Sequence, residues 1–566
     1  MKKRSYVHQV DIDEVFLDAT NLPAFDSARL EGKRELPLQR RSIMRIGILF
    51  LAICGWFMYE VYSLQIIEGS EFRRIAENNR RDRTVVIAER GVIFDRRGEM
   101  IAWNEVDHRG IHDFPVRAYT NRPGLGHVVG FVSYPRKDAH GFYFRTDYIG
   151  RAGVELSFDE VLRGENGSAF IEVDARSAVI SEYALRAPVQ GNPVHLSIDA
   201  ELSSALYDII ATSSAQAGFR SGAGAIMNVH TGELIALTSF PSFDPEVMAD
   251  GLDQAQIDAY TNDPRLPFLN KVVSGVYTPG SVVKPFVAYA ALSQDIIDPR
   301  TVIVSTGEIV VPNRFNPSNP ARFTDWRPHG RMTMREAIAF SSNVYFYIIG
   351  GGFRDQPGLG ITRMAEYYRR FGLGTTTGIT LAEEQPGVVP DPEWKQRVFD
   401  DDWRLGDTYF TAIGQFGFLT TPLQMLRAYA ALANGGYLVT PHVAAGEVGE
   451  RINIGLDSQH VQIVREGMRM AVNFDGGTAR GMERRSVAVA AKSGTAEVGA
   501  GNAYVNSWAA GFWPYEEPEY AFVLMMDRAP RSNALGATNI MGKVVTWMEE
   551  HRPEYLGITP AANDVE

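Results

Sequence analysis

The chain has 566 residues, of which 45% are apolar and 22% are charged, and this length leaves room for roughly three or four domains of average size. Its net charge of -12 argues against a nucleic-acid partner, because binding phosphates requires a basic face. The single cysteine, Cys54, excludes disulfides within the chain and cysteine-rich metal sites.

An apolar segment near the N-terminus predicts one membrane-spanning helix over residues 43–65. Residues 46–59 carry no charge, and the rings of Trp56, Tyr59 and Tyr62 lie where such a helix would meet the membrane surface. A buried helix or a cleaved signal peptide is the alternative. Cleavage fits less well, because the preceding tail is too long for the charged start of an ordinary signal peptide.

The charges that flank this segment favour a cytoplasmic N-terminus. Arg40, Arg41 and Arg45 lie beside its N-terminal end, whereas the first cation beyond it is Arg73. We therefore expect a cytoplasmic tail over residues 1–42, a single pass through the inner membrane, and most of the chain on the outer side.

The outer part divides where its sequence pattern changes, near Gln190. The first region mixes short apolar runs with glycine, arginine and aspartate, which predicts an irregular strand-rich module. Residues 194–199 then predict a strand, and residues 200–217 predict a helix. We accordingly expect a module over residues 66–190, a large domain over 191–555 and a C-terminal tail over 556–566.

The large domain has strand signals at both of its ends and helical signals between them. Apolar runs at 223–228 and 234–238, around a turn that contains glycine, predict a hairpin. Further strands are expected at 487–491, 507–513 and 520–526, and a helix at 541–551. Helical patterns occupy residues 286–292, 334–349, 361–371 and 423–433. This order predicts an α+β fold, with one antiparallel sheet flanked by helices.

Ser281 and Lys284 form a Ser-x-x-Lys pair at the start of an apolar helical run. One helical turn brings the two side chains together. A serine hydroxyl needs an adjacent base to attack at neutral pH, and a lysine can be that base when burial lowers its pKa. Pro285 disfavours a helical conformation at Lys284, so we expect a loosened first turn. Alone, the pair would also fit a solvent-facing helix start.

Ser341, Ser342 and Asn343 interrupt the apolar pattern of residues 334–349. The side chains of Ser341 and Asn343 can face one cleft from a loop. Because serine and asparagine are common at helix boundaries, a simple cap or turn is the alternative.

A third polar element, formed by Lys492, Ser493, Gly494 and Thr495, follows the predicted strand 487–491. On an edge strand that lines a cleft, Lys492 can attract a substrate carboxylate while the strand backbone pairs with an extended peptide. Gly494 would leave space for a close approach. A turn after a strand is the alternative for this element alone.

Together and in this order, the three elements resemble the Ser-x-x-Lys, Ser-x-Asn and Lys-Ser-Gly set of the penicillin-binding proteins and class A β-lactamases. Residues 90–98, 153–155 and 162–164 look like the non-catalytic, dimerisation-type pedestal of class B penicillin-binding proteins. Residues 413–415 and 421–424 resemble a transpeptidase-domain motif. An acidic glycosyltransferase signature is not found near the membrane segment, which disfavours a bifunctional class A enzyme.

Within class B, the sequences around the three elements look most like those of the elongation enzymes, the penicillin-binding protein 2 group. Asn343 stands where many of these enzymes carry aspartate. The resemblance implies a peptidoglycan D,D-transpeptidase that cross-links stem peptides during elongation of the cell wall. A division-type class B transpeptidase, a D,D-carboxypeptidase or β-lactamase that uses water as acceptor, and a β-lactam-binding receptor are the alternatives.

The resemblance also implies roles for the residues of the three elements. Ser281 would attack the carbonyl between two D-alanines and form an acyl-enzyme, while Lys284 removes its proton. The backbone N–H groups of Ser281 and Thr495 would hold the oxyanion. Ser341 and Asn343 would relay a proton to the leaving amine. The residues implied to bind the terminal carboxylate and line its path are Lys492, Ser493, Gly494 and Thr495.

The resemblance further implies the partners. These are the D-Ala-D-Ala donor stem, an amine acceptor, β-lactams, the membrane, a SEDS-family glycosyltransferase and other proteins of the elongation complex. Neither a cofactor nor a metal is expected. Asp325 and His329 could ligate zinc, but no cysteine lies near them in the sequence.

Overall fold

The structure of the protein is a computed structural model, which describes residues 40–69, 84–139, 143–173, 179–312, 316, 318–381 and 383–558. The chain divides into two units, Met1–Asp82 and Arg83–Glu566. Most of the predicted tails, 1–42 and 556–566, and the start of the predicted pedestal lie outside the described residues. The predicted boundary near Gln190 falls inside the second unit and stays a prediction.

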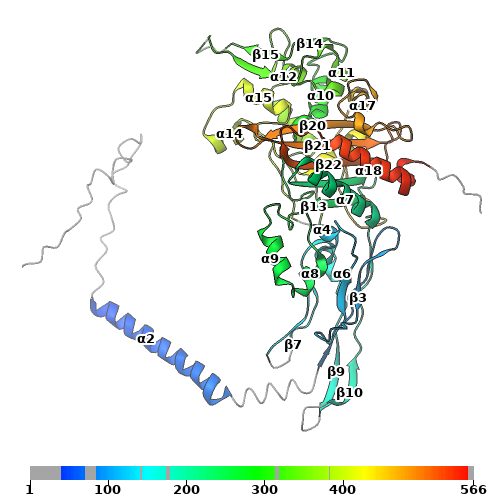
Figure 1. The fold of residues 1–566 in the computed structure, drawn as a ribbon. Coiled ribbons are helices and arrows are strands. Elements are labelled where there is room, and N and C mark those ends of the chain that lie inside the picture. Colours follow the sequence, from blue (N-terminus) through cyan, green and yellow to red (C-terminus); the bar gives the residue numbers. More distant parts are fainter. Residues whose placement is uncertain are drawn as a thin grey trace, which may run out of the picture. The chain divides into compact units, whose positions relative to one another are not determined.

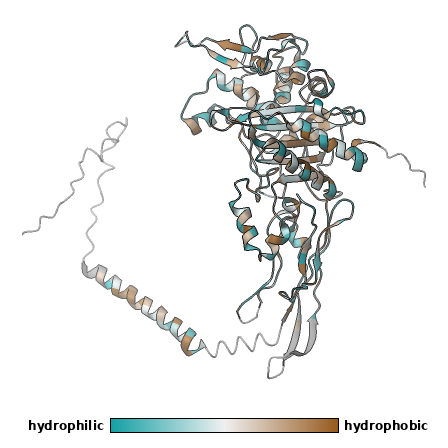
Figure 2. Cartoon of the chain, in the orientation of Figure 1, coloured by the Kyte–Doolittle hydropathy of each residue, from teal (hydrophilic) through white to brown (hydrophobic). Residues whose placement is uncertain are grey.

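The described part of the first unit is the predicted apolar helix. Helix α2 (Arg40–Tyr62) continues into the π-helical turn η2 (Ser63–Ile67). Within the described residues, Gly47–Ile67 is the one helical stretch long and apolar enough to cross a membrane. Its large apolar side chains are exposed, and the brown stretches of α2 in Figure 2 mark its hydrophobic residues. Such a surface is stable when lipid covers it.

The second unit begins with short strands that form the pedestal (Figure 1). Strands β1 (Thr84–Val86), β9 (Gly167–Val173) and β10 (Val179–Arg186) form an antiparallel sheet in the order β1-β9-β10. A second sheet has the order β11-β2-β3-β4, from β2 (Ile93–Phe94), β3 (Met100–Glu105), β4 (Val116–Tyr119) and β11 (Val194–His195). Two strand pairs and three short helices complete the pedestal. The pairs are β5 (Val132–Ser133) with β8 (Ile149–Gly150) and β6 (Arg136–Lys137) with β7 (Tyr143–Arg145). The helices are α4 (Gly126–Val129), α5 (Gly153–Ser157) and α6 (Asp159–Leu162).

A buried ionic network joins two of the motif segments of the pedestal. Glu155, on α5, accepts hydrogen bonds from the guanidinium groups of Arg90 and Arg117, the latter at 2.7 Å. Arg90 also pairs with Asp159 at 2.8 Å. The side chains of Arg90, Arg117 and Glu155 are fully buried. Removing one partner would leave an uncompensated buried charge, so this network ties residues 90–98 to residues 153–155.

The predicted antiparallel sheet is present in the large domain. Its five strands have the order β13-β12-β22-β21-β20, so β20 lies at one edge. These strands are β12 (Ser221–Asn228), β13 (Leu234–Phe240), β20 (Ala490–Val498), β21 (Tyr504–Trp513) and β22 (Tyr520–Pro530). The predicted hairpin at 223–238 is confirmed as β12 and β13, which pair antiparallel.

Side chains alternate between the two faces of the sheet, and helices bury both of them. On β22, Phe522 and Leu524 join a core with residues of α7 (Ala200–Ala217) and α18 (Ala537–His551). Val523, the residue between them, joins the opposite core with α16 (Pro422–Ala433). The prediction of a helix at 200–217 is confirmed by α7, and α18 begins four residues before its predicted start at 541.

The segment 280–473, between the two strand groups, is mostly helical, as predicted, and most of the helices labelled in it lie above the sheet in Figure 1. Its helices are η3 (Gly280–Val283), α10 (Lys284–Ser293), α11 (Met334–Phe340), α12 (Asn343–Gly351), α13 (Ile361–Arg370), α14 (Pro392–Phe399), α15 (Leu405–Ala412) and α17 (Ser458–Asn473). Small strand pairs accompany them: β14 (Ile303–Ser305) with β17 (Gly330–Met332), β15 (Glu308–Val311) with β16 (Ala321–Thr324), and β18 (Tyr437–Val439) with β19 (Arg451–Asn453). The remaining helices are α8 (Pro245–Asp250), α9 (Gln254–Asn262), η4 (Arg480–Met482), η5 (Ala500–Asn502) and η6 (Pro553–Leu556).

Two local predictions were wrong. The strand expected at 487–491 begins at Ala490 and runs on to Val498, so the residues from Lys492 to Thr495 lie inside an edge strand, which was the functional interpretation of this element, and not in the turn that was its alternative. Lys284 keeps a helical backbone, with φ -57° and ψ -37°, despite the proline that follows. The turn just before it, η3, is a 3-10 turn, which is wound more tightly than an α-helix. Pro285 is tolerated because the first turn of a helix needs no backbone N–H donor there.

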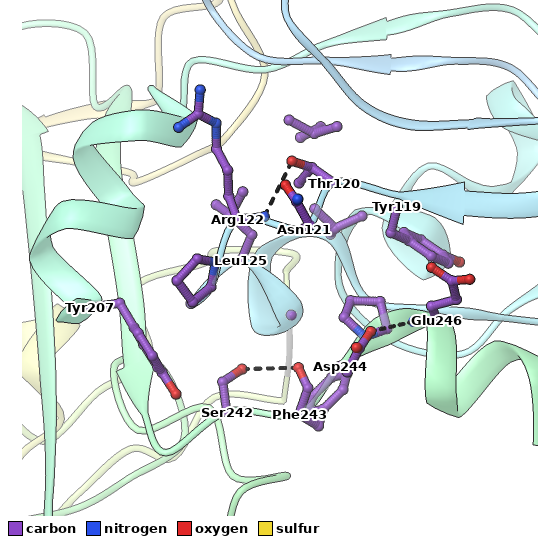
Figure 3. A pocket seen from close by; sticks show the side chains of 16 residues that line it. Tyr119, Thr120, Asn121, Arg122, Leu125, Tyr207, Ser242, Phe243, Asp244 and Glu246 are labelled. Carbon is purple, nitrogen blue, oxygen red and sulfur yellow. Dashed lines mark hydrogen bonds between the residues drawn. The ribbon is translucent and has the colours of Figure 1, made fainter. Parts of the chain in front are cut away.

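Loops of the pedestal and the large domain meet around a cavity of about 290 Å3 (Figure 3). Asn121 and Arg122 come from the loop after β4, and Tyr207 comes from α7. Ser242 and Asp244 line it from the loop between β13 and α8. None of the predicted catalytic residues lines this cavity.

Candidate active site

A larger cavity, of about 760 Å3, lies where the helical segment meets the sheet edge, and we call it the Ser281 cavity. Six of the eight predicted site residues line it: Ser281, Ser341, Asn343, Ser493, Gly494 and Thr495. The other two, Lys284 and Lys492, are fully buried and contact residues of the wall. The structure therefore brings together three elements that lie far apart in the sequence.

Ser281 lies on the 3-10 turn η3 and Lys284 directly follows that turn. In a 3-10 helix the side chains of residues three apart are eclipsed, so the hydroxyl and the amine share one face. Ser281 is partly exposed to the cavity. The turn is anchored from below, because the Tyr429 hydroxyl donates a 2.7 Å hydrogen bond to the Val282 carbonyl.

The Lys284 amine is held among acceptors of the second element. It donates to the Ser341 carbonyl at 2.7 Å and to Asn343 Oδ1 at 2.8 Å, and it lies 3.4 Å from Ser341 Oγ. Burial lowers the pKa of Lys284 to about 7, although the Asp325 carboxylate opposes this shift. A large fraction of the amine is therefore neutral near pH 7, as a proton acceptor must be.

Ser341, Ser342 and Asn343 form the junction between α11 and α12. Ser341 ends α11 in the left-handed region, with φ 57°, and Ser342 caps the start of α12. The sharp turn lets Ser341 and Asn343 face the same cavity, as the sequence predicts. A non-glycine residue in this region is strained, and such strain is frequent at functional sites.

Asp325 fixes this junction, and we considered it from the sequence only as a zinc ligand. Its side chain is fully buried and caps α12 from 18 residues away in the sequence. Asp325 accepts hydrogen bonds from Ser342 Oγ at 2.6 Å, Asn343 N at 2.9 Å and Val344 N at 3.0 Å. Helix-capping carboxylates normally precede their helix by one residue, so no local pattern marks this one.

Asp325 is expected to position the junction, which Asp325→Ala tests. We expect a loss of unfolding free energy of about 1–2 kcal/mol, because two helix N–H groups lose their acceptor. Acylation by penicillin should slow, and its pH midpoint should fall, since the carboxylate raises the pKa of Lys284. Stopped-flow acylation between pH 5.5 and 8.5 measures both effects.

Asp253→Ala is the matched control, because Asp253 caps α9 far from the Ser281 cavity in sequence and is absent from its lining. It should lower stability without changing acylation. An unchanged pH midpoint in Asp325→Ala would show that the carboxylate does not act on Lys284.

His329, the other residue considered as a zinc ligand, lies 3.6 Å from Asp325 (Nε2 to Oδ1). Its ring stacks on that of Phe340. Burial lowers the pKa of His329. In the part of the chain that the structure describes, no group of three His, Cys, Asp or Glu side chains is arranged to hold a metal ion.

Strand β20 and the turn η3 approach each other through glycines. Gly280 has φ 60°, and a Cβ on it would lie 2.8 Å from the Thr495 carbonyl oxygen. A Cβ on Gly494 would lie 2.9 Å from the Pro279 oxygen, so this residue provides the space that the sequence analysis predicts. Gly414, with φ 75°, packs on Gly280 in turn, where a Cβ would lie 2.2 Å from its oxygen. Backbone packing therefore sets the distance between Ser281 and β20.

Lys492 does not line the Ser281 cavity, contrary to the direct contact with substrate that the sequence suggested. Its amine donates to the Ser493 carbonyl at 2.9 Å. Burial and the nearby Lys284 lower the pKa of Lys492 well below its usual value. Ser493 is on the wall, and its hydroxyl donates to Thr478 Oγ1 at 2.8 Å. The polar groups that face a substrate here are thus the hydroxyls of Ser493, Thr495 and Thr478.

Several residues of the Ser281 cavity wall were not predicted from the sequence, because no local sequence pattern marks them. Trp326 and Phe410 are exposed aromatic side chains at the cavity, and Trp508 lies on β21 with its indole N–H donating to the Thr278 carbonyl at 3.0 Å. The sequence marks Gln415 only as part of the motif at residues 413–415. An aromatic residue in a strand or helix more often belongs to a core, so only the fold reveals this use.

Two families match the chain. Residues 222–546 match the penicillin binding protein transpeptidase domain. Residues 110–196 match the penicillin-binding protein dimerisation domain. The first match contains all three elements of the Ser281 cavity, and the second lies within the strand-rich pedestal.

Known proteins are similar over most of the chain. The peptidoglycan D,D-transpeptidase MrdA of Escherichia coli K12 is 28% identical, over 88% of this chain and 92% of that protein. A solved complex between penicillin-binding protein PBP2 and MreC from Helicobacter pylori has a TM-score of 0.68 and 26% identity, over 83% of this chain and 98% of that one. A structure of a peptidoglycan synthase complex that coordinates polymerization and crosslinking also has a TM-score of 0.68 and 26% identity, over 92% and 99%.

Proposed function

Because the chain belongs to the penicillin-binding protein transpeptidase family, we infer that it is a class B enzyme of the PBP2 type, a peptidoglycan D,D-transpeptidase of cell-wall elongation. The observation that carries the chemistry is the buried Lys284 amine, with its lowered pKa, one 3-10 turn from a serine on a cavity wall. Nucleophile and base thus lie on one face of the same turn, from which a lysine can activate a serine.

In the proposed reaction, Ser281 attacks the carbonyl between the two terminal D-alanines of a stem peptide as Lys284 takes its proton. The backbone N–H groups of Ser281 and Thr495 stabilise the oxyanion, by about 3–4 kcal/mol per donor. The proton then passes to the leaving D-alanine through Ser341, which lies against the Lys284 amine. Asn343 holds that amine in place. An amine of a second stem finally takes the acyl group from Ser281.

The terminal carboxylate of the donor is proposed to bind at the N-terminal half of β20. Ser493, Thr495 and Thr478 present hydroxyl groups there. Lys492, behind Ser493, contributes through that residue, because its amine donates a hydrogen bond to the Ser493 carbonyl. The open edge of β20 gives the rest of the peptide a strand to pair with.

The pedestal and the apolar helix distinguish this proposal from a carboxypeptidase or β-lactamase, which would use the same catalytic groups. We propose that α2 anchors the enzyme with its N-terminus in the cytoplasm, because Arg40, Arg41 and Arg45 are at that end. The catalytic domain then lies in the periplasm. Likeness to the PBP2–MreC complex and to the peptidoglycan synthase complex supports elongation proteins and a SEDS-family glycosyltransferase as partners.

Labelling with a fluorescent penicillin tests the proposal. The full chain in detergent should be acylated covalently, and protease digestion followed by mass spectrometry should place the label on the peptide that contains Ser281. Boiling in denaturant should not remove it, because the link is an ester. A label on any other peptide would refute the proposed nucleophile.

A further inference from the structure

A second pocket, of about 600 Å3, opens beside the Ser281 cavity. The two share Gln415, Phe416, Glu497 and Asn502 in their walls, so they meet at the C-terminal end of β20. We call it the cationic pocket, after the side chains that line it. The proposed reaction uses none of those side chains.

Positive charge dominates the lining of the cationic pocket. Its cations are Arg220, Arg265, Lys271 and Arg528, and its carboxylates are Glu497 and Asp527. Both carboxylates are partly offset: Glu497 pairs with Arg531 at 2.7 Å, and burial raises the pKa of Asp527. Arg265 is likewise neutralised by Asp263 at 2.7 Å.

Two cations in this pocket form no close ion pair within the described residues, although the buried Asp527 carboxylate attracts both at longer range. The guanidinium of Arg220, in the loop between α7 and β12, makes no hydrogen bond or ion pair there. The amine of Lys271 is nearly fully buried and donates only to two carbonyls, Leu266 O at 2.8 Å and Pro241 O at 3.4 Å. Burial lowers the pKa of Lys271 to about 7, although the Asp527 and Asp263 carboxylates oppose this shift. An anion bound in the pocket would stabilise both charges.

The course of an extended donor along β20 leads into this pocket. With its terminal carboxylate near Ser493 and its scissile bond at Ser281, the upstream part of the peptide must run toward Glu497 and Val498. At about 3.3 Å per residue, two or three upstream residues span the distance from Thr495 to Val498. A carboxylate on the peptide at these positions would meet the cations of this pocket.

The backbone near the pocket also departs from regular strand geometry. Arg528 has φ 53° and lies where the register of β21 and β22 shifts, between Val505 and Ser507. Its N–H donates to the side-chain oxygen of Asn506 at 3.1 Å. A bulge of this kind re-aims side chains and is frequent beside active sites.

We propose that the cationic pocket binds a carboxylate of the donor stem peptide upstream of the D-Ala-D-Ala bond, with Arg220 as its main ligand. This inference rests on the proposed function, because it extends the same substrate from the same cavity. It makes the enzyme selective for acidic stems over amidated ones.

Competition with fluorescent penicillin tests this selectivity on the full chain, because it needs no turnover. Two peptides ending in D-Ala-D-Ala are compared, one with a free upstream carboxylate and one with a carboxamide there. The acidic peptide should protect Ser281 about 10-fold better, or more, because a hydrogen bond to a charged group is strong. Arg220→Gln should remove this advantage, and Arg220→Lys should restore part of it.

Arg300→Gln is the matched control, because Arg300 is a highly exposed arginine paired with Asp298 and absent from both pockets. It should keep the preference of the wild type. Labelling by penicillin alone is measured for each variant, so that protection is expressed relative to that variant's own rate, and absence of labelling in the wild type would count against the proposed function instead. Equal protection by the two peptides in the wild type, or an undiminished preference in Arg220→Gln, would overturn the proposed subsite.

Discussion

Replacing Ser281 by alanine is expected to abolish acylation by penicillin and to reduce cross-linking of stem peptides by about 10⁴-fold or more, because the change removes the nucleophile. The protein should remain folded. The Ser281 side chain is partly exposed and forms no hydrogen bond within the described residues, so unfolding should change by no more than about 0.5 kcal/mol. Gel fluorescence, a cross-linking assay and thermal unfolding measure the three quantities.

Ser242→Ala is the control for this experiment. Ser242 lines the other cavity, at the junction with the pedestal, and its loss should leave acylation unchanged. Covalent labelling of Ser281→Ala at the wild-type rate would contradict the mechanism, since it would require another nucleophile.

The second large effect is expected at Lys284, as a loss of the general base. Lys284→Met should slow acylation by about 10²–10⁴-fold. Lys284→Arg should not rescue it, because a guanidinium stays protonated and cannot accept the serine proton. Lys543→Met, an exposed lysine on α18, should leave the rate unchanged.

The pH dependence of the wild type follows from the same amine. Burial lowers the pKa of Lys284 to about 7, and only the neutral form accepts a proton. The acylation rate should therefore rise with pH through about 7 and level off above it. A rate that stays constant from pH 5.5 to 8.5, or that falls as pH rises, would exclude Lys284 as the base.

Much of the fold was accessible from the sequence because its signals are local. Helix α7 has its predicted bounds, since Asp199 caps its start and Gly218 ends it in the left-handed region. The hairpin of β12 and β13 follows from two apolar runs around a turn. The α+β arrangement then follows, because strands at both ends of a helical region can share one sheet.

Predictions failed where tertiary contacts override local pattern. The polar residues after Ala491 look like a turn, yet Lys492 is buried, and pairing with β21 extends the strand to Val498. Asp325 acts on a helix start 18 residues later, so its role depends on the fold bringing them together. Six of the eight predicted site residues line the Ser281 cavity, and the buried Lys284 and Lys492 lie behind its wall.

The glycine contacts between η3, β20 and Gly414 constrain how the cavity can adapt under selection by inhibitors. A side chain at Gly280, Gly414 or Gly494 would collide with backbone atoms, so that wall has little freedom to vary. Another part of the rim, with Trp326 and Phe410, is formed by exposed side chains. Substitutions that reduce the binding of bulky β-lactams should therefore arise at the aromatic rim. Compounds that contact mainly the glycine-lined wall should continue to bind.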